Sequence, residues 1–151
     1  MEYLVLTLTK KEEVDSIIRD TIDKVLVLRF GRPSDPSCLQ LDDMLYKSAK
    51  DVSKFATIAT VDIDSLDVQV YVNYFDISYI PSTIFFFNAH HMKMDSGTPD
   101  HTKWVGNFCR RQDLIDVVEA IYRGAMKGKV IVTCPLPPER IPKFQLLYKD
   151  V

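Results

Sequence analysis

Cysteine is scarce in this sequence of 151 residues, and long hydrophobic runs are absent. Its three cysteines, Cys38, Cys109 and Cys134, are odd in number, widely spaced and form no Cys-x-x-Cys pair. Neither a disulfide framework nor a zinc site is therefore indicated, and we expect reduced, mostly buried thiols. The first apolar run, Tyr3–Leu8, is too short to cross a membrane and lacks the flanks of a secretory signal. We therefore expect a cytosolic or nuclear protein without a membrane partner.

An excess of charge of either sign is also lacking, and glycine is rare. The net charge is -2 at pH 7, there are only 5 glycines, and 46% of the residues are hydrophobic. This composition excludes disordered and fibrous classes, and it gives no overall attraction to nucleic acid or anionic lipid. The length favours a single domain over residues 1–151.

Apolar periodicity predicts an alternation of strands and helices. In chain order we expect a strand at Tyr3–Thr7, a helix opened by a Thr9–Glu12 capping box with Val14, Ile17, Ile18 and Ile22 on one face, a strand at Val25–Phe30, a helix over 35–54, a strand at Thr57–Ile63, a short helix from Ser65, an antiparallel hairpin of Ser82–Asn88 with Met92–Met94, and a helix over 111–127 ended by Gly124 and Gly128. The near-continuous apolar run Val25–Phe30 is typical of a strand covered on both faces. The pattern predicts an α/β fold with a central mixed sheet flanked by helices.

This order of elements resembles the thioredoxin fold. The segment from Phe30 to Cys38 is similar to the strand and active loop of thioredoxins, which places Asp35-Pro36-Ser37-Cys38 on the family's Cys-x-x-Cys. Ile80-Pro81-Ser82 resembles the family's Ile-Pro-Thr, whose proline is cis. The resemblance therefore implies a cis peptide bond at Pro81, with a structural role.

The redox site of that family is degenerate in this sequence. Asp35 stands where the first cysteine would be, and Asp followed by Pro36 is a strong helix start, worth about 1 kcal/mol relative to Ala. Cys38 matches the resolving thiol, which acts only after a mixed disulfide has formed on the first sulfur. Arg29 stands where thioredoxins keep a buried carboxylate, and an Arg29–Asp35 ion pair is a further hypothesis. We predict a protein that is not an enzyme and has no catalytic residue; the alternative is a residual thiol–disulfide oxidoreductase acting through Cys38 alone.

No metal or cofactor is expected. The adjacent His90 and His91 lie at the predicted hairpin turn, where neighbouring side chains point to opposite faces and cannot share a metal.

A basic, proline-rich extension follows the last predicted helix over residues 128–151. Residues 123–151 carry six basic and two acidic side chains, a net charge of +4 in an otherwise acidic protein. Four prolines exclude a continuous helix there. The cations that we predict to bind a partner are Arg123, Lys127, Lys129, Arg140 and Lys143. Packing of the extension on its own domain and direct RNA contact are the alternatives.

Four longer segments make the resemblance more specific. They are VLVLRFGRPSDPSCLQLDD, YFDISYIPSTIFFFN, GTPDHTKWVGNF and AIYRGAMKGK, and they are similar to the DIM family of thioredoxin-like spliceosomal proteins. That resemblance implies a non-enzymatic nuclear factor in pre-mRNA splicing, bound to tri-snRNP proteins that include a repeat-containing pre-mRNA-processing factor. It also implies a role in cell-cycle progression and self-association as a homodimer.

Overall fold

The structure is a computed structural model that describes residues 5–142. Its strands and helices, in chain order, are β1 Leu6–Leu8, α1 Lys11–Asp20, β2 Val25–Gly31, α2 Pro36–Val52, β3 Ala56–Asp62, the 3-10 helix η1 Leu66–Val68, α3 Gln69–Tyr74, β4 Ser82–Phe87, β5 His90–Asp95, β6 Trp104–Val105, α4 Arg111–Met126, β7 Ile131–Thr133 and the 3-10 helix η2 Pro138–Arg140. Tyr3, where the first strand was predicted to begin, lies outside the described residues.

The strands form a single mixed sheet in the order β1-β3-β2-β4-β5-β7, with β6 paired to β4. β1, β3 and β2 are parallel, whereas β4 runs antiparallel to both β2 and β5. β7 returns parallel to β5 and ends the sheet. The predicted mixed sheet and the predicted hairpin are thus confirmed.

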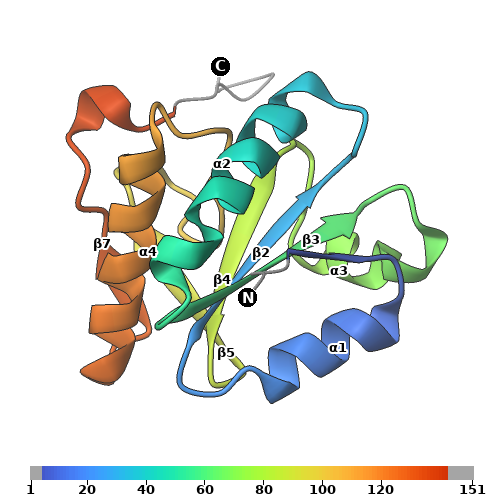
Figure 1. Ribbon diagram of the computed structural model, residues 1–151, viewed down its shortest axis with the longest axis horizontal. Helices are drawn as coiled ribbons and strands as arrows, with labels where there is room; N and C mark the ends of the chain where they lie inside the picture. Colours follow the sequence, from blue (N-terminus) through green and yellow to red (C-terminus); the bar gives the residue numbers. More distant parts are fainter. Residues whose placement is uncertain (1–4, 143–151) are drawn as a thin grey trace.

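Helices cover both faces of the sheet, with α2 and α4 on one side and α1 and α3 on the other (Figure 1). Every residue of β2 is buried, as its apolar run predicts. Val25 and Val27 belong to the core beneath α2 and α4. Leu26 and Leu28 belong to the core beneath α1 and α3. Because side chains of a strand alternate between faces, one strand supplies both cores and fixes the middle of the fold.

The start of α1 differs from the prediction by one residue. The helix begins at Lys11, and the Glu13 carboxylate, instead of that of Glu12, accepts hydrogen bonds from the backbone of Thr9 and Lys10, at 3.0 and 3.1 Å. Ile22 lies beyond the helix and is 59% exposed, so its predicted place on the apolar face is wrong.

Gly124 was predicted to end the last helix, but α4 continues past it to Met126. Gly128 follows with a φ of +81°, the left-handed conformation typical of a glycine after a helix. A Cβ on Gly124 would lie 2.2 Å from Cγ1 of Val132. Gly124 therefore permits close contact between α4 and β7, a strand that the sequence analysis missed although Val130-Ile131-Val132 is β-branched.

Candidate functional site

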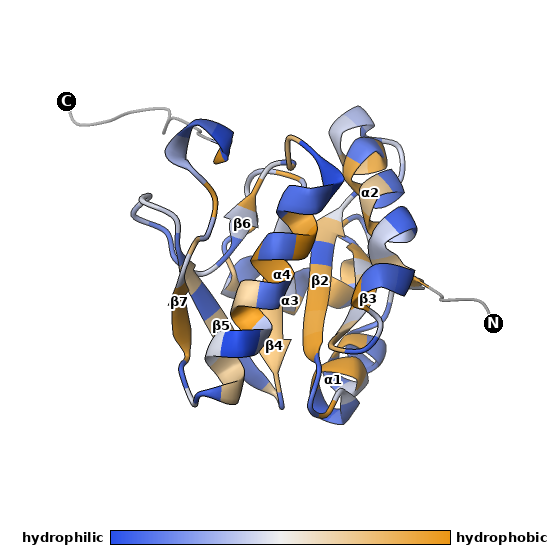
Figure 2. Cartoon of the chain, turned by 60° about the vertical axis from the view of Figure 1, so that its left-hand side comes forward, coloured by the Kyte–Doolittle hydropathy of each residue, from blue (hydrophilic) through white to orange (hydrophobic). Residues whose placement is uncertain are grey.

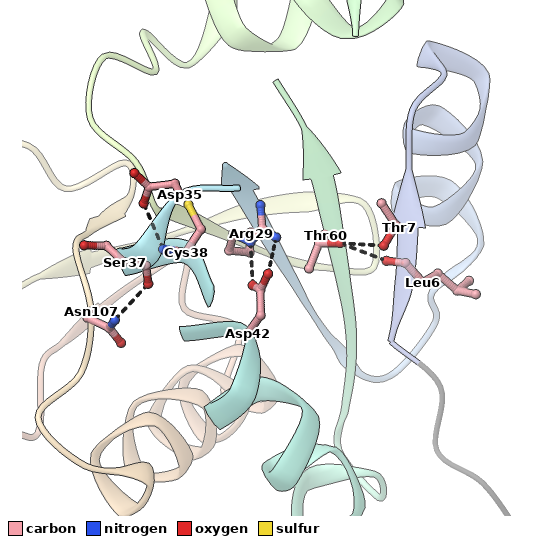
Figure 3. Close-up of polar contacts among 9 residues, drawn as sticks. All are labelled: Leu6, Thr7, Arg29, Asp35, Ser37, Cys38, Asp42, Thr60 and Asn107. Carbon is pink, nitrogen blue, oxygen red and sulfur yellow. Dashed lines mark hydrogen bonds and ion pairs between the residues drawn. The ribbon is translucent and has the colours of Figure 1, made fainter. Parts of the chain in front are cut away.

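Asp35 occupies the position of the absent thiol and caps α2. Its Oδ2 accepts a hydrogen bond from the backbone N–H of Cys38 at 2.9 Å, and Pro36 takes the first helical position (Figure 3). The carboxylate satisfies one of the unpaired N–H groups at the helix start and favours the positive end of the helix dipole. The predicted N-cap is confirmed, and a carboxylate there cannot attack a disulfide.

Cys38 is fully buried one turn into α2. Burial raises the pKa of the Cys38 thiol, and this effect outweighs the opposing influence of the Arg32 backbone N–H and the Arg29 charge. β2 passes so close to the sulfur that a Cβ on Gly31 would lie 2.5 Å from Sγ. A protonated thiol without solvent access is a poor nucleophile.

Arg29 pairs with Asp42, so the hypothesis of an Arg29–Asp35 pair is wrong. Nε and Nη2 of Arg29 donate to Oδ1 and Oδ2 of Asp42 at 2.8 and 2.6 Å. The two side chains are 4% and 28% exposed. Asp42 lies one helical turn after Cys38 on the face of α2 that packs on the sheet, whereas the Asp35 carboxylate is directed to its own helix (Figure 3). The buried pair fastens α2 to β2 directly below the loop.

Pro81 follows a cis peptide bond and is buried, as expected. Its carbonyl oxygen accepts a hydrogen bond from the N–H of Gly106 at 2.8 Å. The next residue, Asn107, donates from Nδ2 to the carbonyl of Ser37 at 3.0 Å. The segments at Ser37, Pro81 and Gly106 are therefore held side by side, and no sequence signal had pointed to Asn107.

The predicted partner-binding cations fall into two groups. Arg123 is exposed on the last turn of α4, with Glu119 3.5 Å away, and Lys127 and Lys129 follow as exposed residues. Arg140 is different, because its Nε lies 3.1 Å from Oδ2 of Asp113, whose side chain is completely buried. Lys143 lies outside the described residues.

The described part of the extension packs against the body of the protein. Asp113 accepts hydrogen bonds from Arg140 and from Arg110 at the start of α4, and thus ties η2 to that helix. Leu136 is buried in the core below α4, and Ile141 packs against it. For residues 128–142 this observation agrees with the alternative that the extension packs on its own domain. Asp113 was missed because nothing in the sequence marks it as buried.

Neither a metal site nor a membrane span was found in the described part of the chain. No group of three or more His, Cys, Asp or Glu side chains in residues 5–142 could hold a metal ion. None of the described helices has the length and apolar character that crossing a membrane requires.

The sequence was compared with protein-family models, and the family described as "Mitosis protein DIM1" matches residues 4–138. The chain belongs to the DIM1 family. Thioredoxin-like protein 4B of Homo sapiens is 60% identical over 151 residues, which is the full length of both chains. "Mitosis protein dim1" of Schizosaccharomyces pombe is 34% identical, over 89% of this chain and 94% of that one. "Spliceosomal protein DIB1" of Saccharomyces cerevisiae is also 34% identical, over 81% of this chain and 84% of that one.

Solved structures show the fold of this DIM1-family chain. Chloroplastic thioredoxin z superposes with a TM-score of 0.63 and 19% identity, over 82% of this chain and 99% of that one. A thioredoxin of Halobacterium salinarum gives a TM-score of 0.63 and 18% identity, over 81% and 95%. The predicted thioredoxin-like fold is confirmed, and at this identity the likeness concerns the fold alone.

Proposed function

We propose that this DIM1-family chain is a non-enzymatic protein-interaction factor in pre-mRNA splicing, with a role in cell-cycle progression and a nuclear location. One observation carries the proposal. Relatives that this chain matches over most of its length are named spliceosomal and mitosis proteins. We also propose that residues 1–151 form one domain with 128–151 as its extension, which the docking of Leu136 and Arg140 supports.

The chemistry of the former thiol site supports a role without catalysis. The Asp35 carboxylate replaces the nucleophile, and the Cys38 thiol is buried with a raised pKa. Thiol–disulfide exchange needs an accessible thiolate. A residual activity of Cys38 would require the start of α2 to open, against the buried pair of Arg29 with Asp42.

We propose that the partners are tri-snRNP proteins, including a repeat-containing pre-mRNA-processing factor. The surface proposed for them is the end of α4, where Arg123, Lys127 and Lys129 are exposed. Charges on a binding rim mainly set the association rate and the salt dependence of binding. Arg140 holds the extension in place through Asp113, so its contribution to partner binding would be indirect. Self-association and direct RNA contact remain predictions.

The test is affinity capture from nuclear extract with quantitative mass spectrometry. Wild type and Cys38→Ser are expected to recover the same tri-snRNP proteins. A variant with alanine at Arg123, Lys127 and Lys129 should recover less of them, and the difference should shrink as salt screens the charges. Alanine at Lys47, Lys50 and Lys54 on and after α2 is the control with the same change of net charge.

Two results would contradict the proposal. Failure of the wild-type chain to enrich any tri-snRNP protein would remove the splicing role. Capture of unrelated disulfide-containing clients that disappear with Cys38→Ser would show that the lone sulfur still reacts.

A further inference from the structure

β7 presents an open edge of the sheet. It is the last strand in the order, with β5 as its neighbour, and no strand of residues 5–142 pairs with its outer side (Figure 2). Lys93 N–H donates to the carbonyl of Val130, and Cys134 N–H donates to the carbonyl of Asp95. Because successive residues of a strand direct their backbone groups to opposite sides, Ile131 and Thr133 direct their N–H and C=O groups away from β5.

Apolar side chains surround this open edge. Val130 and Ile131 are 57% and 43% exposed, and Met126 at the end of α4 is 60% exposed. Exposed strand edges are usually protected by charge, proline or a covering segment, since they otherwise pair with other chains. Here Pro135 limits the strand at one end but leaves the backbone groups of Ile131 and Thr133 open.

The charges around the edge determine what kind of strand it can accept. Lys93, Lys127 and Lys129 are exposed, and none of them forms an ion pair with a residue of the described range 5–142. A second copy of β7 would bring the same lysines together, which is unfavourable. An acidic strand would instead be attracted by them.

We propose that β7 binds an extended acidic segment of a partner protein as an added strand of the sheet. The segment would alternate β-branched residues with Asp or Glu, so that its backbone pairs with Ile131 and Thr133. Its apolar side chains would contact Met126 and Val130, and its carboxylates would face the lysines. This inference rests on the proposed function, because it specifies how a partner of that interaction factor is held.

A labelled nine-residue peptide of alternating valine and glutamate is the probe, and the same peptide with glutamine for glutamate is its control. Binding to the full chain is measured by fluorescence anisotropy at low and high salt. Amide hydrogen exchange should show new protection at Ile131 and Thr133, while β1 at the opposite edge stays unchanged. The neutral peptide should bind more weakly, and its affinity should vary less with salt.

Two variants separate the backbone contacts from the charges. Ile131→Pro removes an outward N–H without touching the pairing with β5, and should weaken binding about tenfold, whereas Ile131→Ala should weaken it by about threefold or less. Lys127→Glu with Lys129→Glu should weaken the glutamate peptide more than the glutamine peptide. Should Ile131→Pro fail to fold, the exchange data and the charge variant still decide the question.

Three results would overturn the inference: no binding, protection that maps away from β7, or protection that rises with protein concentration alone as the chain dimerises. Nuclear extract then separates the two proposals. If Ile131→Pro loses the peptide but still captures tri-snRNP proteins as wild type does, the strand-addition proposal fails and the proposed function stands. If wild type binds the peptide but captures none of those proteins, the proposed function fails.

Discussion

Replacing Asp42 by alanine should destabilise the fold strongly, because it leaves the Arg29 guanidinium buried without its counter-charge. Arg29 is 4% exposed and cannot reach water without leaving the core, whereas Asp42 is 28% exposed. Breaking a buried ion pair by removing one partner costs about 3–5 kcal/mol. Since Asp42 is partly solvated, we expect a loss of about 3 kcal/mol in the free energy of unfolding, measured by urea denaturation at constant pH.

The neighbouring Asp43 supplies a matched control. Its pair with Lys47 has both side chains 61% exposed, so Asp43→Ala should cost about 0.5 kcal/mol or less. The double variant Arg29→Met with Asp42→Ala should recover much of the loss, because no buried charge is left unpaired. If Asp42→Ala and Asp43→Ala lower the free energy of unfolding equally, or if the double variant recovers nothing, the reasoning about burial is refuted.

Three further outcomes follow from the packing and the pKa shifts. Gly124→Ala should lower the free energy of unfolding by about 1–3 kcal/mol despite the better helix propensity of alanine, and Val132→Ala in the same chain should restore most of it in urea titrations. Burial lowers the pKa of His91 below 6.5, so the unfolded chain binds the proton more readily; stability should fall as the pH drops below about 6.5, and His91→Phe should flatten that slope. At neutral pH iodoacetamide should modify the exposed Cys109 well before the buried Cys38, as peptide mass spectrometry would show; equal rates would contradict the burial of Cys38.

The local patterns of the sequence predicted much of the fold but less of the site. The apolar run of β2 and the Asp35-Pro36 start of α2 carry their signal in adjacent residues, and both were predicted correctly. The partner of Arg29 was not, because Asp35 and Asp42 follow it closely in sequence and only the packing of α2 on β2 selects between them. Gly124 was misread as a helix end because its contact, Val132, comes from a strand eight residues further on.

The sequence by itself determined that the thiol chemistry is incomplete, since a carboxylate at Asp35 cannot do the work of a cysteine. It also determined the alternation of strands and helices, because hydrophobic periodicity is a local property. Only the tertiary structure decided that Arg140 faces the buried Asp113 while Lys127 and Lys129 stay exposed, and that β7 ends the sheet with an open edge. Burial depends on contacts between distant segments, so the role of a charge is settled by the fold that surrounds it.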